Sequence, residues 1–413
     1  MDNRAGPEIT TDQLRAVAAA LGTGVVVTVR AIVTTGGIDK KLVLARHLYD
    51  DVQLLTSIRT RLRELNAACE QLPDLESRET LRPDGPRLDT CEDDAILNLL
   101  YRTFKPRLSE EIRTRRINIH PVWDEPTARI LDQCIRTLEA QFEEASAFLN
   151  KKSNNELRNN QDIFLHRPIR SSMPLPAMPG RSNEFEIVET VSRPPLTTPP
   201  PLLKAALLHY LLMSTEIPTI EHCAALIWDH AQETPWEFVE DMSRQCWDEA
   251  RHAQACILGL KELGHRPGDF PIEISLWRMT LHKPLALRLA IHQRLGEWLG
   301  LDAALWWATR LEGSGDTATA DMFRFIANDE RSHVAFGNKW LRFLLQTDAA
   351  IRLIHEEAEA VRASCGAGTN RTAPFPINVE ECTAVGFSPS EVGQLTQERK
   401  AGEAARRSGA EPI

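Results

Sequence analysis

The stretch Asp248-Glu-Ala-Arg-His252 is repeated 81 residues further along the chain as Asp329-Glu-Arg-Ser-His333. Each copy contains a glutamate and a histidine three residues apart, directly preceded by an aspartate. On a helix, residues three apart lie on one face, so the two side chains point the same way. Four-helix bundles that hold two metal ions take a Glu-x-x-His pattern from each of two helices and one glutamate from each of the others. The repeat therefore predicts a dimetal site in an all-α protein.

Two single glutamates should complete the site, each one helix upstream of a motif. Glu221 precedes Glu249 by 28 residues, and Glu297 precedes Glu330 by 33. Both separations suit a helix, a turn and a return along a neighbouring helix. The predicted metal ligands are Glu221, Glu249, His252, Glu297, Glu330 and His333.

The alternative is that these motifs are solvated surface charges, because short patterns also occur by chance. Their apolar surroundings argue against this. Met242 and Ala253 share the helical face of the first motif, and Ile326 and Val334 share that of the second. An unpaired carboxylate within such a stripe would be costly, and a metal ion is a partner that several carboxylates can share.

Two cysteines, Cys246 and Cys256, fall on the face of the first motif. Cysteine is a soft ligand, whereas a site rich in glutamate with two histidines favours hard metals such as iron or manganese. We therefore expect both cysteines to pack as small buried hydrophobes.

At these motifs the chain resembles the ferritin-like di-iron carboxylate superfamily. Residues 174–393 look like a family of ferritin-like domains of unknown function that is related to non-haem di-iron oxygenases. The stretches that carry the resemblance are Pro174-Leu-Pro-Ala-Met-Pro-Gly180, Trp247-Asp-Glu-Ala-Arg-His252, Leu263-Gly-His265, Gly268-Asp-Phe270, Gly315-Asp316, Asp329-Glu-Arg-Ser-His333, Gly337-Asn-Lys-Trp340, Pro374-Phe-Pro-Ile-Asn378 and Gly386-Phe387. The resemblance implies two iron ions, or one iron and one manganese, as cofactor. It also implies that Asp248 orients His333 and that Asp329 orients His252, since such partners set the tautomer and direction of a ligand histidine.

Composition narrows the class of protein further. The chain has 413 residues, 42% of them hydrophobic, and a net charge of −10 with no basic run outside the last dozen residues. This balance argues against a nucleic-acid partner. The polar start is unlike a signal peptide, and the apolar run 24–33 is too short for a membrane span and is broken by Arg30. The eight scattered cysteines indicate reduced thiols, so we expect a cytoplasmic protein without a membrane partner.

The chain is long for one domain, and its composition divides it. We expect an N-terminal helical domain without a metal site at 1–150, an irregular linker or arm at 151–201, a ferritin-like dimetal bundle at 202–350 and a C-terminal extension at 351–413. The expected helices are 11–35, 39–71, 92–115 and 125–151 in the first domain, and 202–214, 218–232, 235–264, 283–311 and 316–346 in the second.

The N-terminal domain invites comparison with the second one. Its last expected helix contains Leu138-Glu-Ala-Gln-Phe142, which aligns with Asp248-Glu-Ala-Arg-His252 and has Phe142 at the position of the ligand histidine. This alignment predicts a degenerate, metal-free ferritin-like bundle, although coincidence in a helix rich in Glu and Ala explains it equally well.

The ligand types indicate redox chemistry with O2. We expect a non-haem di-iron (or Fe/Mn) oxygenase or oxidase that acts on a small organic molecule with the help of an electron donor, and a homodimer is allowed. The resemblance implies hydroxylation, N-oxygenation, desaturation or oxidative C–C cleavage as reactions. The alternatives are a tRNA-modifying hydroxylase, a ferroxidase or iron store, and a non-catalytic metal-stabilised scaffold. No residue identifies the substrate.

Overall fold

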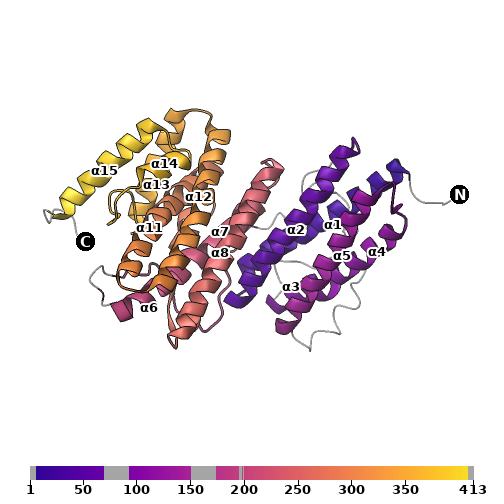
Figure 1. Cartoon of the computed structure of the whole chain (residues 1–413), viewed down its shortest axis with the longest axis horizontal. Coiled ribbons are helices and arrows are strands. Elements are labelled where there is room, and N and C mark those ends of the chain that lie inside the picture. The colour runs from indigo at the N-terminus through magenta and orange to yellow at the C-terminus, as the bar shows by residue number, and fades with distance from the viewer. Residues whose placement is uncertain (1–5, 69–92, 150–173, 195–197, 199, 408–413) are drawn as a thin grey trace. The chain divides into compact units, whose positions relative to one another are not determined.

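The computed structural model describes residues 6–68, 93–149, 174–194, 198 and 200–407 (Figure 1). In these residues the protein is all-α, which confirms the predicted fold class. The one sheet among them is a parallel pair of two-residue strands, β1 (Ile187–Val188) and β2 (Ile272–Glu273), in which Ile187 pairs with Ile272. The hydrophobic core is therefore built by helices.

The chain divides into two compact units. The first comprises Met1–Ser182 and Cys223–Ala250, and the second comprises Asn183–His222 and Arg251–Ile413. The division passes through two helices, α7 (Ile217–His230) and α8 (Trp236–Glu262). The expected domain boundaries near residues 150, 201 and 350 do not coincide with this division and stay predictions.

Four N-terminal helices of the first unit, α1, α2, α4 and α5, pack against one another in a closed ring, called the N-terminal ring below. α1 contacts α2 and α4, and α5 contacts α2 and α4 (Figure 1). The bounds are α1 (Pro7–Thr34), α2 (Ile38–Glu64), α3 (Asp93–Asn98), the π-helical turn η1 (Leu99–Phe104), α4 (Lys105–Ile117), α5 (Glu125–Ala145) and the short 3-10 turn η2 (Ser146–Phe148). These helices correspond to the four expected ones, but the second ends at Glu64 rather than 71, the fourth ends at Ala145 rather than 151, and a π-turn interrupts the third. Residues 69–71 and 150–151 lie outside the described residues.

The first helix is more apolar than the sequence analysis expected. α1 contains an 18-residue window that could cross a membrane by length and composition, and 83% of that window is buried inside the protein. The sequence analysis considered only the run 24–33 and took Arg30 to break it, whereas a window of this composition can include an arginine. In the folded protein Arg30 is not a solvated charge. Its guanidinium is buried, donates to the backbone oxygen of Pro174 at 3.1 Å and lies over the ring of Trp228. The burial of α1 is that of a core helix.

Part of the expected linker, residues 174–194, is described. The backbone N–H of Gly180 donates to the oxygen of Val33, and that of Ser182 donates to the oxygen of Gly36. A Cβ at position 180 would lie 1.9 Å from the backbone oxygen of Thr34, so only glycine allows this approach. The segment therefore packs along the end of α1.

A buried ion pair occupies the interior of the N-terminal ring. Lys105 Nζ lies 2.7 Å from Asp51 Oδ2 and 2.5 Å from Gln141 Oε1, and Gln141 Nε2 donates to Asp51 Oδ1. His47 continues the cluster, with Nδ1 2.7 Å from the Tyr101 hydroxyl, and burial lowers the pKa of this histidine well below its usual range. The ammonium group of Lys105 thus supplies the positive charge that pairs with the buried carboxylate of Asp51.

The proposed alignment of Phe142 with a ligand histidine was wrong. Phe142 is 39% exposed, and the neighbouring Glu139 pairs with Arg113 at the surface. The buried positions in this part of α5 are Leu138, Gln141 and Ala145. Phe142 follows the buried Gln141 by one residue and therefore faces outward. The helical period had left this choice of face open.

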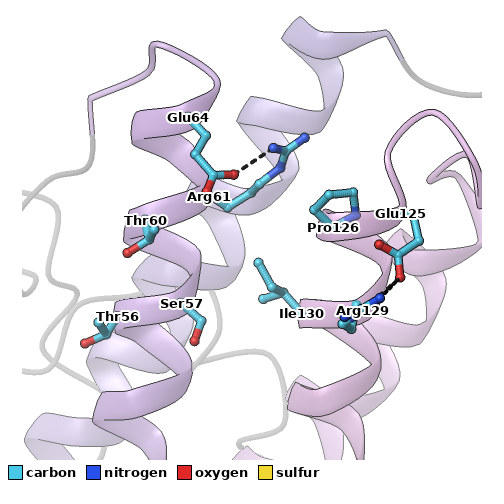
Figure 2. A pocket seen from close by; sticks show the side chains of 9 residues that line it. All are labelled: Thr56, Ser57, Thr60, Arg61, Glu64, Glu125, Pro126, Arg129 and Ile130. Carbon is cyan, nitrogen blue, oxygen red and sulfur yellow. Dashed lines mark hydrogen bonds and ion pairs between the residues drawn. The ribbon is translucent and has the colours of Figure 1, made fainter.

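A surface pocket of about 420 Å³ opens between α2 and α5 (Figure 2). Thr56, Ser57, Thr60, Arg61 and Glu64 line it from α2, and residues 125, 126, 129 and 130 line it from α5. Its charged groups are paired with each other, Arg61 with Glu64 and Arg129 with Glu125.

The remaining helices belong wholly or partly to the second unit. They are α6 (Pro200–Tyr210), the π-turn η4 (Leu211–Glu216), α7, α8, the 3-10 turn η5 (Pro267–Asp269), α9 (Ser275–Thr280), α10 (Leu285–Leu289), the π-turn η6 (Ala290–Gly296), α11 (Glu297–Gly313), α12 (Thr317–Leu345), α13 (Asp348–Ser364), α14 (Val379–Ala384) and α15 (Pro389–Arg407). Gly264 and Gly315, both with positive φ, mark the ends of α8 and α11. Asp316 caps α12 by accepting from the backbone N–H of Thr319.

A helix break that the sequence analysis placed before Pro218 is absent. α6, η4 and α7 run on from Pro200 to His230. Proline lacks the N–H that continues an α-helical ladder, and the π-turn just before it accommodates this loss within one continuous helix. Pro106 follows η1 at the same spacing as Pro218 follows η4.

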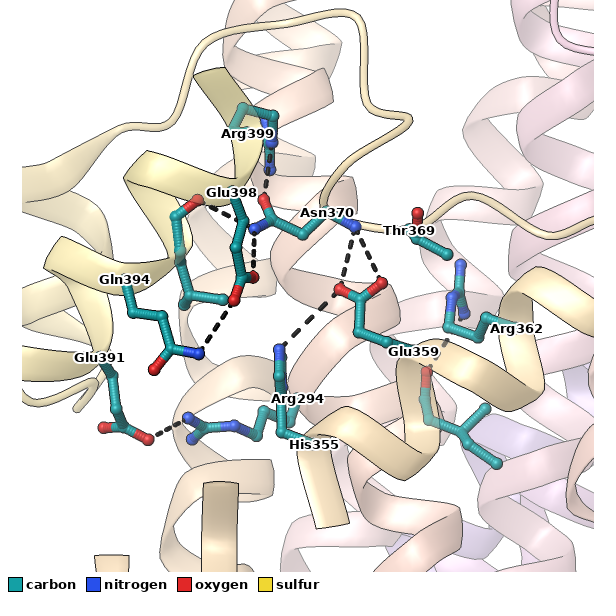
Figure 3. Close-up of polar contacts among 12 residues, drawn as sticks. Arg294, His355, Glu359, Arg362, Thr369, Asn370, Glu391, Gln394, Glu398 and Arg399 are labelled. Carbon is teal, nitrogen blue, oxygen red and sulfur yellow. Dashed lines mark hydrogen bonds and ion pairs between the residues drawn. The ribbon is translucent and has the colours of Figure 1, made fainter. Parts of the chain in front are cut away.

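Two buried arginines join η6 to the helices that follow it in the chain (Figure 3). Arg294 of η6 bonds to Asn338 of α12 and to Glu391 of α15, while Arg362 of α13 donates to the backbone oxygen of Ile291. His355 lies beside Arg294, and burial together with the charge of Arg294 lowers its pKa to about 3.

The ion pair of Lys105 gives a first prediction. Lys105→Met should destabilise the protein by about 3–5 kcal/mol, because Asp51 would remain buried without its cation. The double variant Lys105→Met/Asp51→Leu should recover most of this loss. Urea unfolding followed by circular dichroism measures both, with the exposed Arg129→Ala as control. A double variant as unstable as the single one would contradict the electrostatic explanation.

His355 gives a second prediction, on pH. Between pH 6.5 and about 3 the unfolded chain binds a proton at this side chain that the folded protein does not. As the pH is lowered through this window, the free energy of unfolding should therefore decrease by about 1.4 kcal/mol per pH unit from His355 alone. His355→Phe lacks this group. The slope of its unfolding free energy against pH should therefore be smaller than that of the wild type by the contribution of one bound proton. Parallel curves for the two proteins would refute the assignment.

Candidate metal centre

The two Glu-x-x-His motifs lie in the middle of long helices. Glu249 and His252 belong to α8, and Glu330 and His333 belong to α12. All four residues are buried, with at most 5% of the surface of any of them exposed. Each pair is three residues apart on a regular helix, so its members share one face.

Two groups of buried side chains lie close enough to hold a metal ion. The first is Glu249, Glu297, Glu330 and His333, and the second is Glu216, Glu249 and His252. Within each group, one ligand atom per residue lies within 4.8 Å of all the others. Among the residues that the structure describes, no other such group occurs. Glu249 belongs to both groups, so one carboxylate connects the two candidate positions.

One predicted glutamate is not in these groups. Glu221 is buried on α7, but Glu216, the last residue of η4, takes part instead. The sequence analysis began its helix at Pro218 and so did not consider Glu216. Pro218 was the available signal: a proline inside a continuous apolar helix calls for a local irregularity, and π-turns are frequent at functional sites.

Both single glutamates of the groups adjoin a π-turn. Glu216 ends η4, and Glu297 directly follows η6. A Cβ on Gly300 would lie 3.9 Å from the Glu330 carboxyl carbon, an ordinary van der Waals contact, so this glycine leaves room for a methyl group beside that carboxylate.

The orientation of His252 is set from two sides. Its Nε2 lies 3.2 Å from Asp329 Oδ2, and its Nδ1 lies 3.5 Å from Glu216 Oε2. An ionised carboxylate only accepts hydrogen bonds, so Asp329 favours the tautomer with the proton on Nε2. The lone pair of Nδ1 then points toward Glu216, as in a histidine that binds metal through Nδ1. Arg251 also bonds to Asp329 at 2.8 Å and keeps it in place.

His333 presents the same ring atom to the first group. Its Nδ1 lies 3.4 Å from Glu330 Oε2 and 3.9 Å from Glu297 Oε2. The two imidazole rings are 6.1 Å apart between centroids. Two histidines thus direct Nδ1 toward carboxylates.

The other motif aspartate has a partner on its own helix. Asp248 is buried and accepts two hydrogen bonds from Arg244 Nε, at 2.8 and 2.9 Å. Arg244 lies over the rings of Trp247 and Tyr49. That Asp248 orients His333 stays a prediction.

Cys246 and Cys256 are fully buried and belong to neither group. Burial raises the pKa of both thiols, and the charges of Glu249 and Glu216 respectively add to the effect. Their place outside the two groups fits the predicted role of small buried hydrophobes.

The donor set suits a pair of hard, redox-active ions. It consists of carboxylate oxygens and imidazole nitrogens, which are ligands for iron and manganese. Glu216, Glu249, Glu297 and Glu330 carry four negative charges, which two divalent ions would neutralise. These residues therefore fit the dimetal cofactor that the sequence predicted, while the identity of the metal stays a prediction.

The chain belongs to the family of proteins of unknown function called DUF455, whose model matches residues 134–393, more than half of the chain. No curated protein and no solved structure matches it. The matched region contains every residue of the two groups.

The contact of Asp329 gives a third prediction. Asp329→Asn should keep the fold but weaken metal binding by about 10–100-fold, because the amide no longer fixes the proton on Nε2 of His252. Titration of the metal-depleted protein with Fe(II) under anaerobic conditions measures this. Asp321→Asn, an exposed change on the same helix, is the matched control. Equal affinities in the two variants would mean that Asp329 does not act on a bound metal.

Proposed function

We propose that α7 with η4, α8, α11 with η6, and α12 form a ferritin-like four-helix bundle that holds two metal ions and activates O2 to oxidise a small organic substrate. The observation that carries this proposal is the pair of buried ligand groups that share Glu249. One carboxylate common to two positions is the arrangement expected when two ions lie a few ångströms apart. Two iron ions, or one iron and one manganese, would supply the electrons for the reduction of O2.

The side chains have separate roles in this proposal. Glu249 would bridge the two positions, with Glu216 and His252 completing one and Glu297, Glu330 and His333 completing the other. Asp329 would keep the proton of His252 on Nε2, so that Nδ1 stays available. The near-complete burial of the ligands excludes bulk water, which strengthens their electrostatic interactions. Glu221, buried one and a half turns after Glu216, remains a further candidate ligand.

The proposed reaction is an oxidation for which an electron donor resets the site. Hydroxylation, N-oxygenation, desaturation and oxidative C–C cleavage are the reactions that the ferritin-like resemblance makes available. A tRNA-modifying hydroxylase, a ferroxidase and a metal-stabilised scaffold would use the same ligands. The net charge of −10 disfavours the first of these.

Metal stoichiometry gives a fourth prediction. The wild-type protein should bind two metal ions per chain, and Glu249→Ala should lose both, because its carboxylate serves both positions. Glu216→Ala should lose one and keep the other. Elemental analysis after anaerobic loading with Fe(II) measures the counts, and Glu237→Ala, an exposed change on α8, is the control. Full loading of a Glu249→Ala/Glu330→Ala double variant would refute the ligand assignment.

Oxygen consumption separates the functions that share this site. An oxygenase or oxidase reduced by an electron donor should consume O2 repeatedly, and faster with its substrate. A ferroxidase should consume O2 only in proportion to added Fe(II), and a scaffold should consume none in either case. The Glu249→Ala variant is the blank for each measurement.

A further inference from the structure

Glu297 holds its two carboxylate oxygens in different environments. Oε1 lies 2.7 Å from Nε2 of His292, whereas Oε2 faces Nδ1 of His333 at 3.9 Å. Only Oε2 is therefore directed at the histidine of the first ligand group. His292 is buried, as Glu297 is, and belongs to neither ligand group.

The hydrogen bonds around His292 define which nitrogen carries the proton. Nε2 lies 2.8 Å from Thr219 Oγ1, and that hydroxyl donates its own proton to the backbone oxygen of Thr215 at 2.7 Å. An ionised Glu297 can only accept. Nε2 of His292 therefore carries the proton and donates to Thr219 Oγ1, and Glu297 Oε1 lies 2.7 Å from the same nitrogen.

The π-turn is what brings these two side chains together. Residues five apart on a regular α-helix point about 140° away from each other. In η6 the backbone N–H of Glu297 bonds to the oxygen of His292, five residues earlier. This wider turn brings position 297 back over position 292, so the irregular backbone has a direct consequence for the candidate ligand.

The ring of His292 is also held on its other sides. His222 packs edge-on against it with centroids 5.1 Å apart, and Nε2 of His222 lies 3.3 Å from Gln293 Oε1. A Cβ at Gly296 would lie 2.8 Å from Nδ1 of His292, so a glycine at this position leaves the space that the imidazole occupies. The ring is thus fixed by the protein independently of any bound ion.

We propose that His292 is a positioning residue of the metal centre: it holds Oε1 of Glu297, so that Glu297 presents a single oxygen, Oε2, to the metal. This proposal rests on the proposed dimetal function. Without the contact from His292, Oε1 of Glu297 would no longer be held in place, and the affinity of that position for an ion would change. Thr219, His222 and Gly296 act by keeping the imidazole in place.

Co(II) titration of the metal-depleted full-length protein tests this role, because visible Co(II) absorption reports coordination geometry. His292→Leu removes the donor and should weaken Co(II) binding by about 10–100-fold with a shifted visible spectrum. His292→Gln retains an N–H donor and should keep most of the wild-type affinity and spectrum. Circular dichroism and thermal unfolding check that each variant is folded.

The outcomes separate the two levels of the proposal. Wild-type protein that binds no Co(II) refutes the metal centre and this inference together. Wild-type binding with an unchanged His292→Leu variant refutes the positioning role alone. Equal losses in the Leu and Gln variants, whether of Co(II) binding or of the fold, also overturn it, because the donor would then not be the property that matters.

Discussion

The burial of carboxylates in an apolar helical core is the constraint on which the candidate metal centre depends. An isolated carboxylate is strongly disfavoured away from water, and Glu216, Glu249, Glu297 and Glu330 are all almost completely buried. Such a set requires positive charge, shared protons or both. If the imidazoles of His252 and His333 are neutral, with Nδ1 turned toward carboxylates, divalent ions would have to supply that charge. This requirement is the physical basis of the proposed function.

The N-terminal ring meets a related requirement in another way. Asp51 is buried beside Lys105, whose ammonium also bonds to Gln141. A lysine side chain provides positive charge without the binding of an ion, but it offers no open coordination position and no redox chemistry. The buried carboxylates of the N-terminal ring and of the candidate metal centre thus have different partners, and among the described residues only the latter form groups that could hold a metal ion.

π-helical turns adjoin both the buried lysine of the N-terminal ring and two glutamates of the candidate metal centre. η1 immediately precedes Lys105, η4 ends at Glu216 and η6 immediately precedes Glu297. Such turns cost regular hydrogen bonding, and they persist where the surrounding packing determines them. Around η6 this packing includes the arginines Arg294 and Arg362, which tie the turn to α12, α13 and α15. The C-terminal helices, which the sequence analysis treated as an extension, therefore support the segment that carries His292 and leads to Glu297.

Sequence alone determined the helical class, the main helices and the two Glu-x-x-His motifs, because hydrophobic period and residue spacing are local properties of a helix. It also placed Glu297 correctly among the grouped residues, since a regular helix follows it. Tertiary structure decided what depends on irregular backbone and on contacts between distant residues. The ligand groups contain Glu216, which ends a π-turn that the sequence analysis did not place, and the buried position of α5 is Gln141 rather than Phe142. The pairings of His292 with Glu297 and of Lys105 with Asp51 have the same origin: a helical period specifies a face, and only the folded chain specifies what that face meets.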